Sequence, residues 1–149
     1  MNGEILYRPL TENDLKAVDE LESLCFCDPW TKNMFLGAFL SEFFCGFGAF
    51  DGEKLVGFIV STVVFEDAET DDIAVHPDYR RKGIGGKLLF KAEEEAVKRG
   101  AARAFLEVRV GNGAAFALYE KCGYKTLRRR KRYYPDGEDA FVMTKRLAH

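Results

Sequence analysis

A short basic segment rich in glycine, residues 80–86 (RRKGIGG), separates a strand-like run from a long amphipathic helix. Gly83 and Gly85 let backbone N–H groups approach an anion closely, and the start of a helix adds partial positive charge. Arg81 and Lys82 add formal charge. The segment lacks the Gly-Lys-Ser/Thr ending of a Walker loop and the third spaced glycine of a dinucleotide fingerprint. It predicts either a pyrophosphate cradle or an ordinary glycine-rich helix entry with solvated basic residues.

Strand alternation and helical spacing predict elements in the order β-α-α-β-β-β-α-β-α-β-β. A chain of 149 residues with no repeat and no long linker is expected to form a single domain over 1–149. The predicted strands cover residues 4–10, 46–50, 54–65, 69–75, 104–110, 124–134 and 140–145, and the predicted helices cover 11–25, 31–42, 83–99 and 112–122.

Three of the predicted helices carry an apolar face at helical spacing. The first helix also has a shortened capping box, in which Thr11 is the cap and Asp14 the third helical residue. The residues at these spacings are Leu15, Val18, Leu21, Glu22 and Cys25 in the first helix, Met34, Phe35, Ala38 and Phe39 in the second, and Ile84, Leu88, Leu89, Ala92 and Ala96 in the third.

The net charge and the small number of cysteine and histidine residues exclude several classes of protein. The 24 acidic and 22 basic residues give a net charge of −2, which argues against nucleic-acid binding through a bulk positive field. The four cysteines have no C-x-x-C spacing, and His76 and His149 are the two histidines, so we expect neither a metal site nor a disulfide framework. The longest apolar run, 55–65, is about half a membrane span. Because residues 1–4 carry no targeting signal, we expect a reduced, cytoplasmic protein with no membrane association.

Residues 73–85 (IAVHPDYRRKGIG) resemble the signature of the GNAT acyltransferase superfamily, in which Arg/Gln-x-x-Gly-x-Gly/Ala follows a strand. Residues 105–124 resemble the second half of that family. The ending 129–140 (RRKRYYPDGEDA) and Pro29-Trp30 resemble one branch, the bacterial ribosomal-protein-alanine N-acetyltransferases. The resemblance covers essentially the whole chain. It implies an α/β (α+β) GNAT fold: a mixed, mostly antiparallel central sheet of about six to seven strands, flanked by helices.

The family transfers acetyl from acetyl-CoA directly to an amine, and the resemblance implies Glu107 as general base and Tyr119 as the acid for the departing thiolate. A base is needed because a protein α-amine, with a pKa of about 7.7–8.0, is largely protonated at pH 7. Glu107 interrupts an apolar run, so burial should raise its pKa. The resemblance assigns acetyl-CoA contacts to the backbone of Ile73, Ala74 and Val75 and to Arg81, Lys82, Gly83, Ile84, Gly85, Gly86 and Asn112, and it implies no metal.

Each of these assignments has a structural alternative. Glu107 could instead form a salt bridge with Arg109 on the same strand face. Tyr119 could be a packed aromatic with its hydroxyl at the surface. Asn112 can cap the helix that it opens, which is compatible with a cofactor contact. Cys122 is expected to be a small buried apolar residue and not an acyl-carrying nucleophile, because no base is close by in the sequence.

Charge is segregated along the chain. Five acidic residues fall within 66–72 and five basic residues occupy 128–132. These runs are either solvated strand faces with charges paired across the sheet or, for the acidic stretch, an attractor for an amine or a basic peptide. The basic run has no interleaved aromatic residues, so we expect no dedicated nucleic-acid site.

The resemblance implies a peptide or protein N-terminus as the acceptor, with Tyr133, Tyr134 and Glu138 lining it. The expected acceptor is the N-terminal alanine of a small-subunit ribosomal protein. Acetylation of a small-molecule amine or a lysine side chain and a non-catalytic CoA-binding interaction domain remain as alternatives. The sequence departs from the branch at Gly111, where serine is usual, and at Asp71, where an apolar residue is expected.

Overall fold

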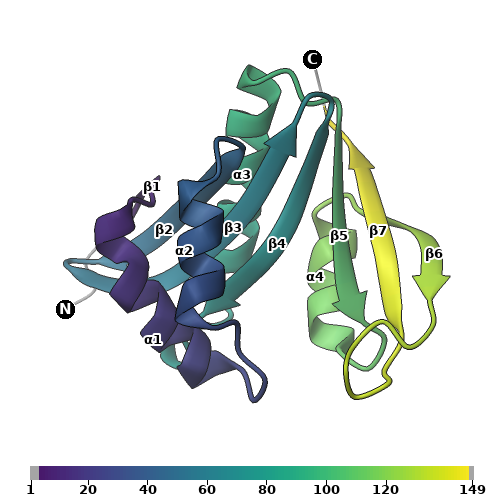
Figure 1. Cartoon of the computed structure of the whole chain (residues 1–149), viewed down its shortest axis with the longest axis horizontal. Helices are drawn as coiled ribbons and strands as arrows, with labels where there is room; N and C mark the ends of the chain where they lie inside the picture. Colours follow the sequence, from purple (N-terminus) through teal and green to yellow (C-terminus); the bar gives the residue numbers. More distant parts are fainter. Residues whose placement is uncertain (1–3, 148–149) are drawn as a thin grey trace.

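A computed structural model describes residues 4–147 of the chain; Met1, Asn2, Gly3, Ala148 and His149 lie outside the described residues. Its centre is a seven-stranded sheet in the order β1-β2-β3-β4-β5-β7-β6 (Figure 1). The β4–β5 pair is parallel and each other neighbouring pair is antiparallel, which confirms the predicted mixed, mostly antiparallel sheet. The strands are β1 (Ile5–Pro9), β2 (Phe44–Asp51), β3 (Lys54–Val64), β4 (Asp67–Val75), β5 (Arg103–Arg109), β6 (Lys125–Arg130) and β7 (Ala140–Arg146).

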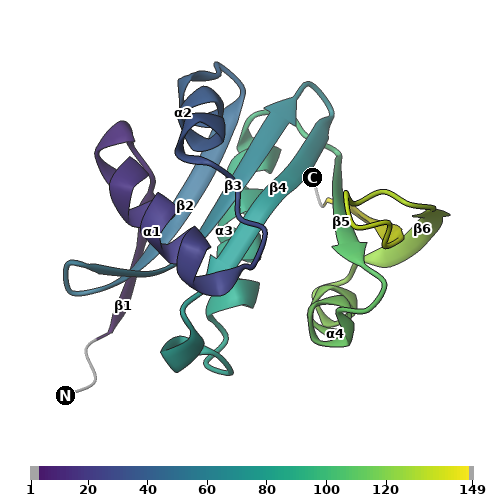
Figure 2. The same ribbon diagram turned by 60° about the horizontal axis from the view of Figure 1, so that its bottom comes forward.

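Helices cover both faces of the sheet. Figures 1 and 2 show α1 and α2 on one face of β2–β4 and α3 on the other. Phe35 and Phe58 are buried in the core on the α1–α2 side, and Leu88 and Leu106 in the core on the α3 side. The helices are α1 (Leu15–Cys25), preceded by the 3-10 turn η1 (Glu12–Asp14), α2 (Lys32–Leu40), α3 (Ile84–Lys98), preceded by η2 (Pro77–Tyr79), and α4 (Gly113–Lys121).

The predicted apolar face of α3 is confirmed, whereas that of α2 is wrong at one position. Met34 is 49% exposed, because α2 buries only Phe35 and Phe39 against the sheet. The predicted strand over 124–134 is too long at its end. Arg132 takes a left-handed conformation (φ 53°), and Oδ1 of Asp139 accepts its N–H at 2.9 Å, so the chain leaves the ladder after Arg130.

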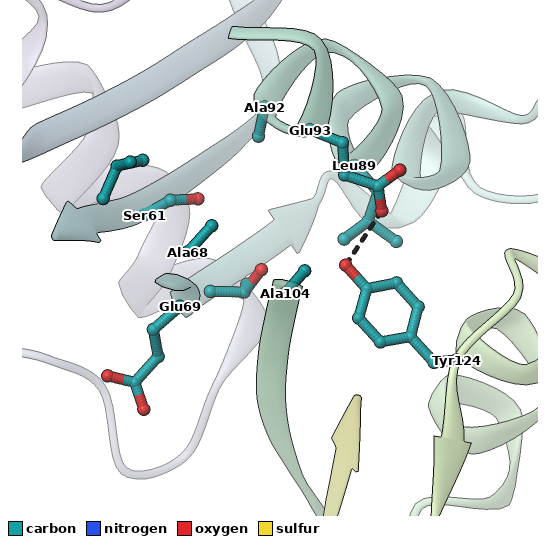
Figure 3. A pocket seen from close by; sticks show the side chains of 10 residues that line it. Ser61, Ala68, Glu69, Leu89, Ala92, Glu93, Ala104 and Tyr124 are labelled. Carbon is teal, nitrogen blue, oxygen red and sulfur yellow. Dashed lines mark hydrogen bonds between the residues drawn. The ribbon is translucent and has the colours of Figure 1, made fainter. Parts of the chain in front are cut away.

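The parallel pair of β4 and β5 is short. Only Asp67–Glu69 of β4 pair with Arg103–Phe105 of β5, and the strands then diverge. A small cavity lined by Ser61, Ala68, Ala104 and Tyr124 lies at this paired end (Figure 3). At its rim the Tyr124 hydroxyl donates to Glu93 of α3 at 2.8 Å, and Lys145 of β7 lies 2.8 Å from the same carboxylate. This network fixes the paired end and leaves the diverging end for the site.

Candidate active site

The strand edge of β4 is unpaired along residues 70–75 on the side of β5, because the two strands have diverged there. This segment contains Ile73, Ala74 and Val75, whose backbone was predicted to meet the cofactor. The Val75 carbonyl already accepts from Nε of Arg80 at 3.1 Å and from Sγ of Cys25 at 3.5 Å. The remaining groups on this edge can pair with the amides of an extended ligand, as an added strand would.

The entry to α3 has the features of an anion cradle. Gly83 is in the left-handed region (φ 79°) at the cap position, and no side chain caps the helix. The first N–H groups of α3 therefore point outward with no side-chain acceptor. Arg81, itself at φ 63°, and Lys82 are exposed beside them. A Cβ built on Gly83 meets nothing within 4 Å, so glycine is favoured at this position by the backbone conformation and not by lack of space.

Gly85 has a different role from Gly83. A Cβ at this position would lie 3.2 Å from the side chain of Leu118 on α4. The small residue therefore permits close packing between the start of α3 and α4, next to the diverging strands. Apart from Asn112, the residues predicted to hold acetyl-CoA thus lie on two adjoining features, the unpaired edge of β4 and the segment that leads into the uncapped start of α3. Both features offer backbone groups to a phosphorylated, amide-bearing ligand.

Glu107 lies in the middle of β5. Its neighbours Leu106 and Val108 face the α3 side, so Glu107 faces the α1–α2 side. Its side chain is 16% exposed, and Nη1 of Arg130 approaches it only to 3.9 Å. No residue within 4–147 donates a hydrogen bond to its carboxylate. Burial, reinforced by the charge of Glu69 and opposed by Arg130, raises the pKa of Glu107 above its ordinary value. This carboxylate is free to accept a proton.

The alternative assignment of Glu107 to a salt bridge with Arg109 is wrong. The Arg109 guanidinium lies 2.8 Å from Asp136 and 2.9 Å from Glu138, and it stacks on the ring of Tyr134 at 4.0 Å. These contacts turn Arg109 toward the loop after β6 and leave Glu107 without it.

Tyr119 of α4 is 7% exposed and packs in the core on the α3 side, with the Tyr124 ring 6.2 Å from its own. Burial first, then the charge of Asp72, raises the pKa of Tyr119. Its hydroxyl is therefore protonated at neutral pH, as an acid must be. The charge of Asp71 adds to the raised pKa of Glu107, as that of Asp72 adds to the raised pKa of Tyr119. Neighbouring residues of β4 thus contribute to the electrostatics of the two predicted catalytic groups, which come from β5 and α4.

Asn112 caps α4, since its Oδ1 accepts the N–H of Ala115 at 3.1 Å. This is the structural role that the sequence allowed, and the side chain is exposed at the same end of α4. Cys122 is partly buried at the other end of that helix, and burial raises the pKa of its thiol. A protonated thiol is a poor nucleophile.

Glu138 binds within the chain. Its carboxylate pairs with Arg109 and accepts the N–H of Gly111 at 2.9 Å. A Cβ at Gly111 would come within 2.6 Å of Oε2 of Glu138, which gives a physical reason for glycine in place of the expected serine. Tyr133 and Tyr134 lie with their rings 5.0 Å apart, and burial, with a smaller contribution from the charge of Glu107, raises the pKa of both. The two tyrosines therefore lie on the same side of the molecule as the predicted base.

Asp71 and Asp72 are half-buried on β4, and a third acidic residue, Glu22 of α1, lies with them. Thr62 donates to Asp71 at 2.5 Å, and burial raises the pKa of Asp71 to about 6. Sequence reasoning did not assign Glu22 to the site. Its signal was present, however, because Glu22 falls within the apolar face of the first helix, where a carboxylate requires a buried partner.

Within residues 4–147, no helix has the length and apolar character needed to cross a membrane. The same part of the chain contains no cluster of three or more histidine, cysteine, aspartate and glutamate side chains arranged to hold a metal ion.

Comparison with known proteins assigns the family. Residues 15–124 match the model of the acetyltransferase (GNAT) family. The chain belongs to the GNAT acetyltransferase family, as its sheet with a divergent β4–β5 pair and its uncapped, basic entry to α3 indicate.

Relatives named for one acceptor cover nearly the whole chain. The [ribosomal protein bS18]-alanine N-acetyltransferase of Escherichia coli K12 is 39% identical over 90% of this chain and 92% of its own. A putative enzyme of the same name in Bacillus subtilis is 34% identical over 96% of each chain. The crystal structure of the Escherichia coli ribosomal-protein-S18-alanine N-acetyltransferase superposes with a TM-score of 0.91 at 36% identity, covering 98% of this chain and 96% of that one.

Proposed function

We propose that this protein transfers the acetyl group of acetyl-CoA to the N-terminal α-amine of a protein. The single observation that carries the proposal is the Glu107 carboxylate, on a chain 39% identical to an alanine N-acetyltransferase. This carboxylate is largely buried, its pKa is raised, and no residue in the described part of the chain donates a hydrogen bond to it. The acceptor is the N-terminal alanine of a small-subunit ribosomal protein of the bS18 type. We place the reaction in the cytoplasm as part of this proposal.

The chain's own residues divide the work. Acetyl-CoA, when bound, supplies a thioester carbonyl as the electrophile. The uncapped start of α3, with Arg81 and Lys82, holds its phosphates, and the unpaired edge of β4 aligns its amide-bearing arm. An N–H of the same edge stabilises the oxyanion. Asn112 orients the arm from the start of α4.

Proton transfer assigns roles to the two remaining groups. Glu107 removes a proton from the acceptor ammonium, directly or through one water, because its raised pKa lies nearer to that of the amine. Tyr119 gives its proton to the departing thiolate, since burial keeps the hydroxyl protonated. Tyr133 and Tyr134 border the acceptor beside Glu107.

A competition assay between peptides that differ only in their first residue tests the acceptor. The peptides carry the same following sequence and begin with alanine, serine, glycine or methionine. We expect the alanine peptide to be acetylated with the highest kcat/KM. Equal rates for all first residues would contradict the alanine assignment, and faster acetylation of a small polyamine would favour a small-molecule acetyltransferase.

A further inference from the structure

Glu22 is an almost fully buried acid on the apolar face of α1, with 2% of its surface exposed. Its Oε2 accepts the N–H of Trp30 at 2.9 Å, which ties α1 to the following loop, residues 26–31. No N–H or O–H donor within residues 4–147 reaches its other oxygen, Oε1. A buried carboxylate oxygen without a donor is costly, so this atom needs an explanation.

Asp72 of β4 supplies that explanation. Its carboxyl lies close to that of Glu22, and within residues 4–147 its Oδ2 is likewise buried without a donor. The charged groups that act on Asp72 are Glu22 and Asp71, and neither is a cation. Two carboxylates in contact and shielded from water cannot both ionise. One proton between them satisfies both bare oxygens with a charge-assisted hydrogen bond.

The other groups near Glu22 and Asp72 do not supply a positive charge that would allow both carboxyls to ionise. Cys25 of α1 and Tyr119 of α4 both lie near Asp72, and burial keeps each of them neutral. Arg80 is the nearby cation, and it is directed to the Val75 carbonyl and the Cys25 thiol. Burial and Glu22 together raise the pKa of Asp72 well above its ordinary value.

The pair connects the loop to the candidate active site. The chain of contacts runs from the Trp30 N–H through Glu22 to Asp72, on the stretch of β4 that has no partner on β5. The Trp30 ring packs on Phe35 with centroids 5.1 Å apart, and Cys25 donates to the Val75 carbonyl. The loop therefore lies over the α1–α2 face, which is also the face of Glu107.

We propose that Glu22 and Asp72 share a single proton and that this carboxyl pair positions the 26–31 loop for binding of the acceptor. The proposal rests on the proposed function for its kinetic consequence, whereas the shared proton does not depend on it. Glu22 and Asp72 are positioning residues, because in this proposal they act through the loop that Glu22 holds and not on the reacting atoms.

The shared proton is tested by thermal and urea unfolding of Asp72→Asn and of the wild type between about pH 4 and pH 8. A carboxyl with a raised pKa in the folded state stabilises the fold below its ordinary value of 3.8, and this contribution is lost as the pH rises. Asparagine keeps the contact with Glu22 and does not titrate. We therefore expect the folding equilibrium constant of Asp72→Asn, divided by that of the wild type, to grow with pH by up to about tenfold per pH unit.

Two further variants sharpen this test. Glu22→Gln should give the same growing ratio, and the double variant should add little, because both changes remove one proton site. Asp67→Asn, at the exposed end of the same strand, is the control for loss of an acidic side chain from β4. A ratio for Asp72→Asn that does not change with pH would overturn the shared proton.

The positioning role is tested with the alanine peptide. Asp72→Ala removes the contact and should raise the KM for the peptide by about tenfold or more, with the KM for acetyl-CoA unchanged. Asp72→Asn, which keeps the contact with Glu22, should have the peptide KM of the wild type. An Asp72→Ala variant with lowered Tm and an unchanged peptide KM would overturn the positioning role. Absence of acetyl transfer by the wild type would overturn the proposed function, while the unfolding ratios would still report the shared proton.

Discussion

The Glu107 carboxylate has no close arginine partner within the described part of the chain, and this keeps its pKa from being lowered. Two candidate partners of its carboxylate are engaged elsewhere or distant, since Arg109 binds Asp136 and Glu138, and Arg130 stays 3.9 Å away. A closer arginine would lower the pKa of the carboxylate and weaken it as a base. The loop after β6 thus supports the site by holding Arg109 away from it.

Replacement of the two predicted catalytic groups should lower turnover without unfolding the protein. We expect Glu107→Gln and Tyr119→Phe each to reduce kcat by about 10²–10⁴-fold, because each removes a proton-transferring group and conserves shape. Steady-state assays with the alanine peptide measure this, with Glu94→Gln on the exposed face of α3 as the control. Near-normal kcat in both variants would disprove the assignment.

The pH dependence of kcat follows from the same carboxylate. Glu107 acts in its ionised form, and its pKa is raised in the folded protein. Activity should therefore fall as the pH drops through that raised value, with a limb above the ordinary glutamate pKa of 4.5. A pH–rate profile checks this. A limb at or below 4.5 would mean that Glu107 is not the base.

Glu107 and Tyr119 were assigned through the resemblance to the GNAT family, and the apolar run that Glu107 interrupts supported the first of them. Sequence reasoning could not reach the Glu22–Asp72 contact, which joins residues fifty positions apart in the chain (72 − 22) and depends on how α1 packs on β4. The Gly111–Glu138 contact was equally hidden. The departure at Gly111 was visible, but its cause is a carboxylate that returns from the loop after β6.

At the scale of elements, most of the fold was predictable, because periodicity fixes a helix face or a strand. The five predicted positions of the α3 stripe are the five that are buried. The ends of elements were less predictable. The strand β6 ends before the predicted residue 134 because Asp139 accepts the backbone N–H of Arg132, and no local sequence pattern predicts that hydrogen bond. The divergence of β4 from β5 depends on the twist of the whole sheet.

The start of α3 requires a glycine at one position for its backbone alone. Gly83 has a φ of 79° and empty space around its missing Cβ, so Gly83→Ala should destabilise the fold by about 1 kcal/mol through strain. Gly37, inside α2 and also unobstructed, is the matched control. Gly37→Ala should stabilise by about 0.5–1 kcal/mol. Urea unfolding measures both, and a stabilising Gly83→Ala would contradict the proposed conformation.

The same element should bind phosphate through charge. Removal of both Arg81 and Lys82 by alanine should raise the KM for acetyl-CoA and make it less sensitive to salt, with the peptide KM unchanged. Initial rates at two ionic strengths measure this. Lys98→Ala, at the other end of α3, serves as the control. Equal effects of the double variant on both substrates would count against a phosphate cradle.

At the scale of the whole molecule, a net charge of −2 conceals an arrangement of opposite charges. The basic entry to α3 lies at one side of the diverging strands. Glu69, Asp71 and Glu107 face the other side with α1 and α2. The basic run of β6 is partly neutralised across the sheet, by Arg129 with Asp139 and Arg130 near Glu107. The charges are thus distributed to suit an anionic cosubstrate and a cationic acceptor.

Reversal of one acidic charge should separate the two substrates. Glu69 is exposed, so Glu69→Lys changes the field on the acceptor side without burying a charge. We expect a higher KM for the peptide and no change for acetyl-CoA, the reverse of the pattern for Arg81 and Lys82. Asp72 is unsuited to this reversal because it is buried against Glu22. A rise in both KM values would instead indicate a general loss of structure.

The position of the transferred acetyl group tests the central claim most directly. A peptide with a free N-terminal alanine and one internal lysine is incubated with acetyl-CoA and the protein, and fragmentation mass spectrometry locates the acetyl group. We predict a single acetyl group on the alanine α-amine, none on the lysine, and no transfer to the same peptide with a blocked N-terminus. Acetylation of the lysine, or transfer to the blocked peptide, would contradict the account.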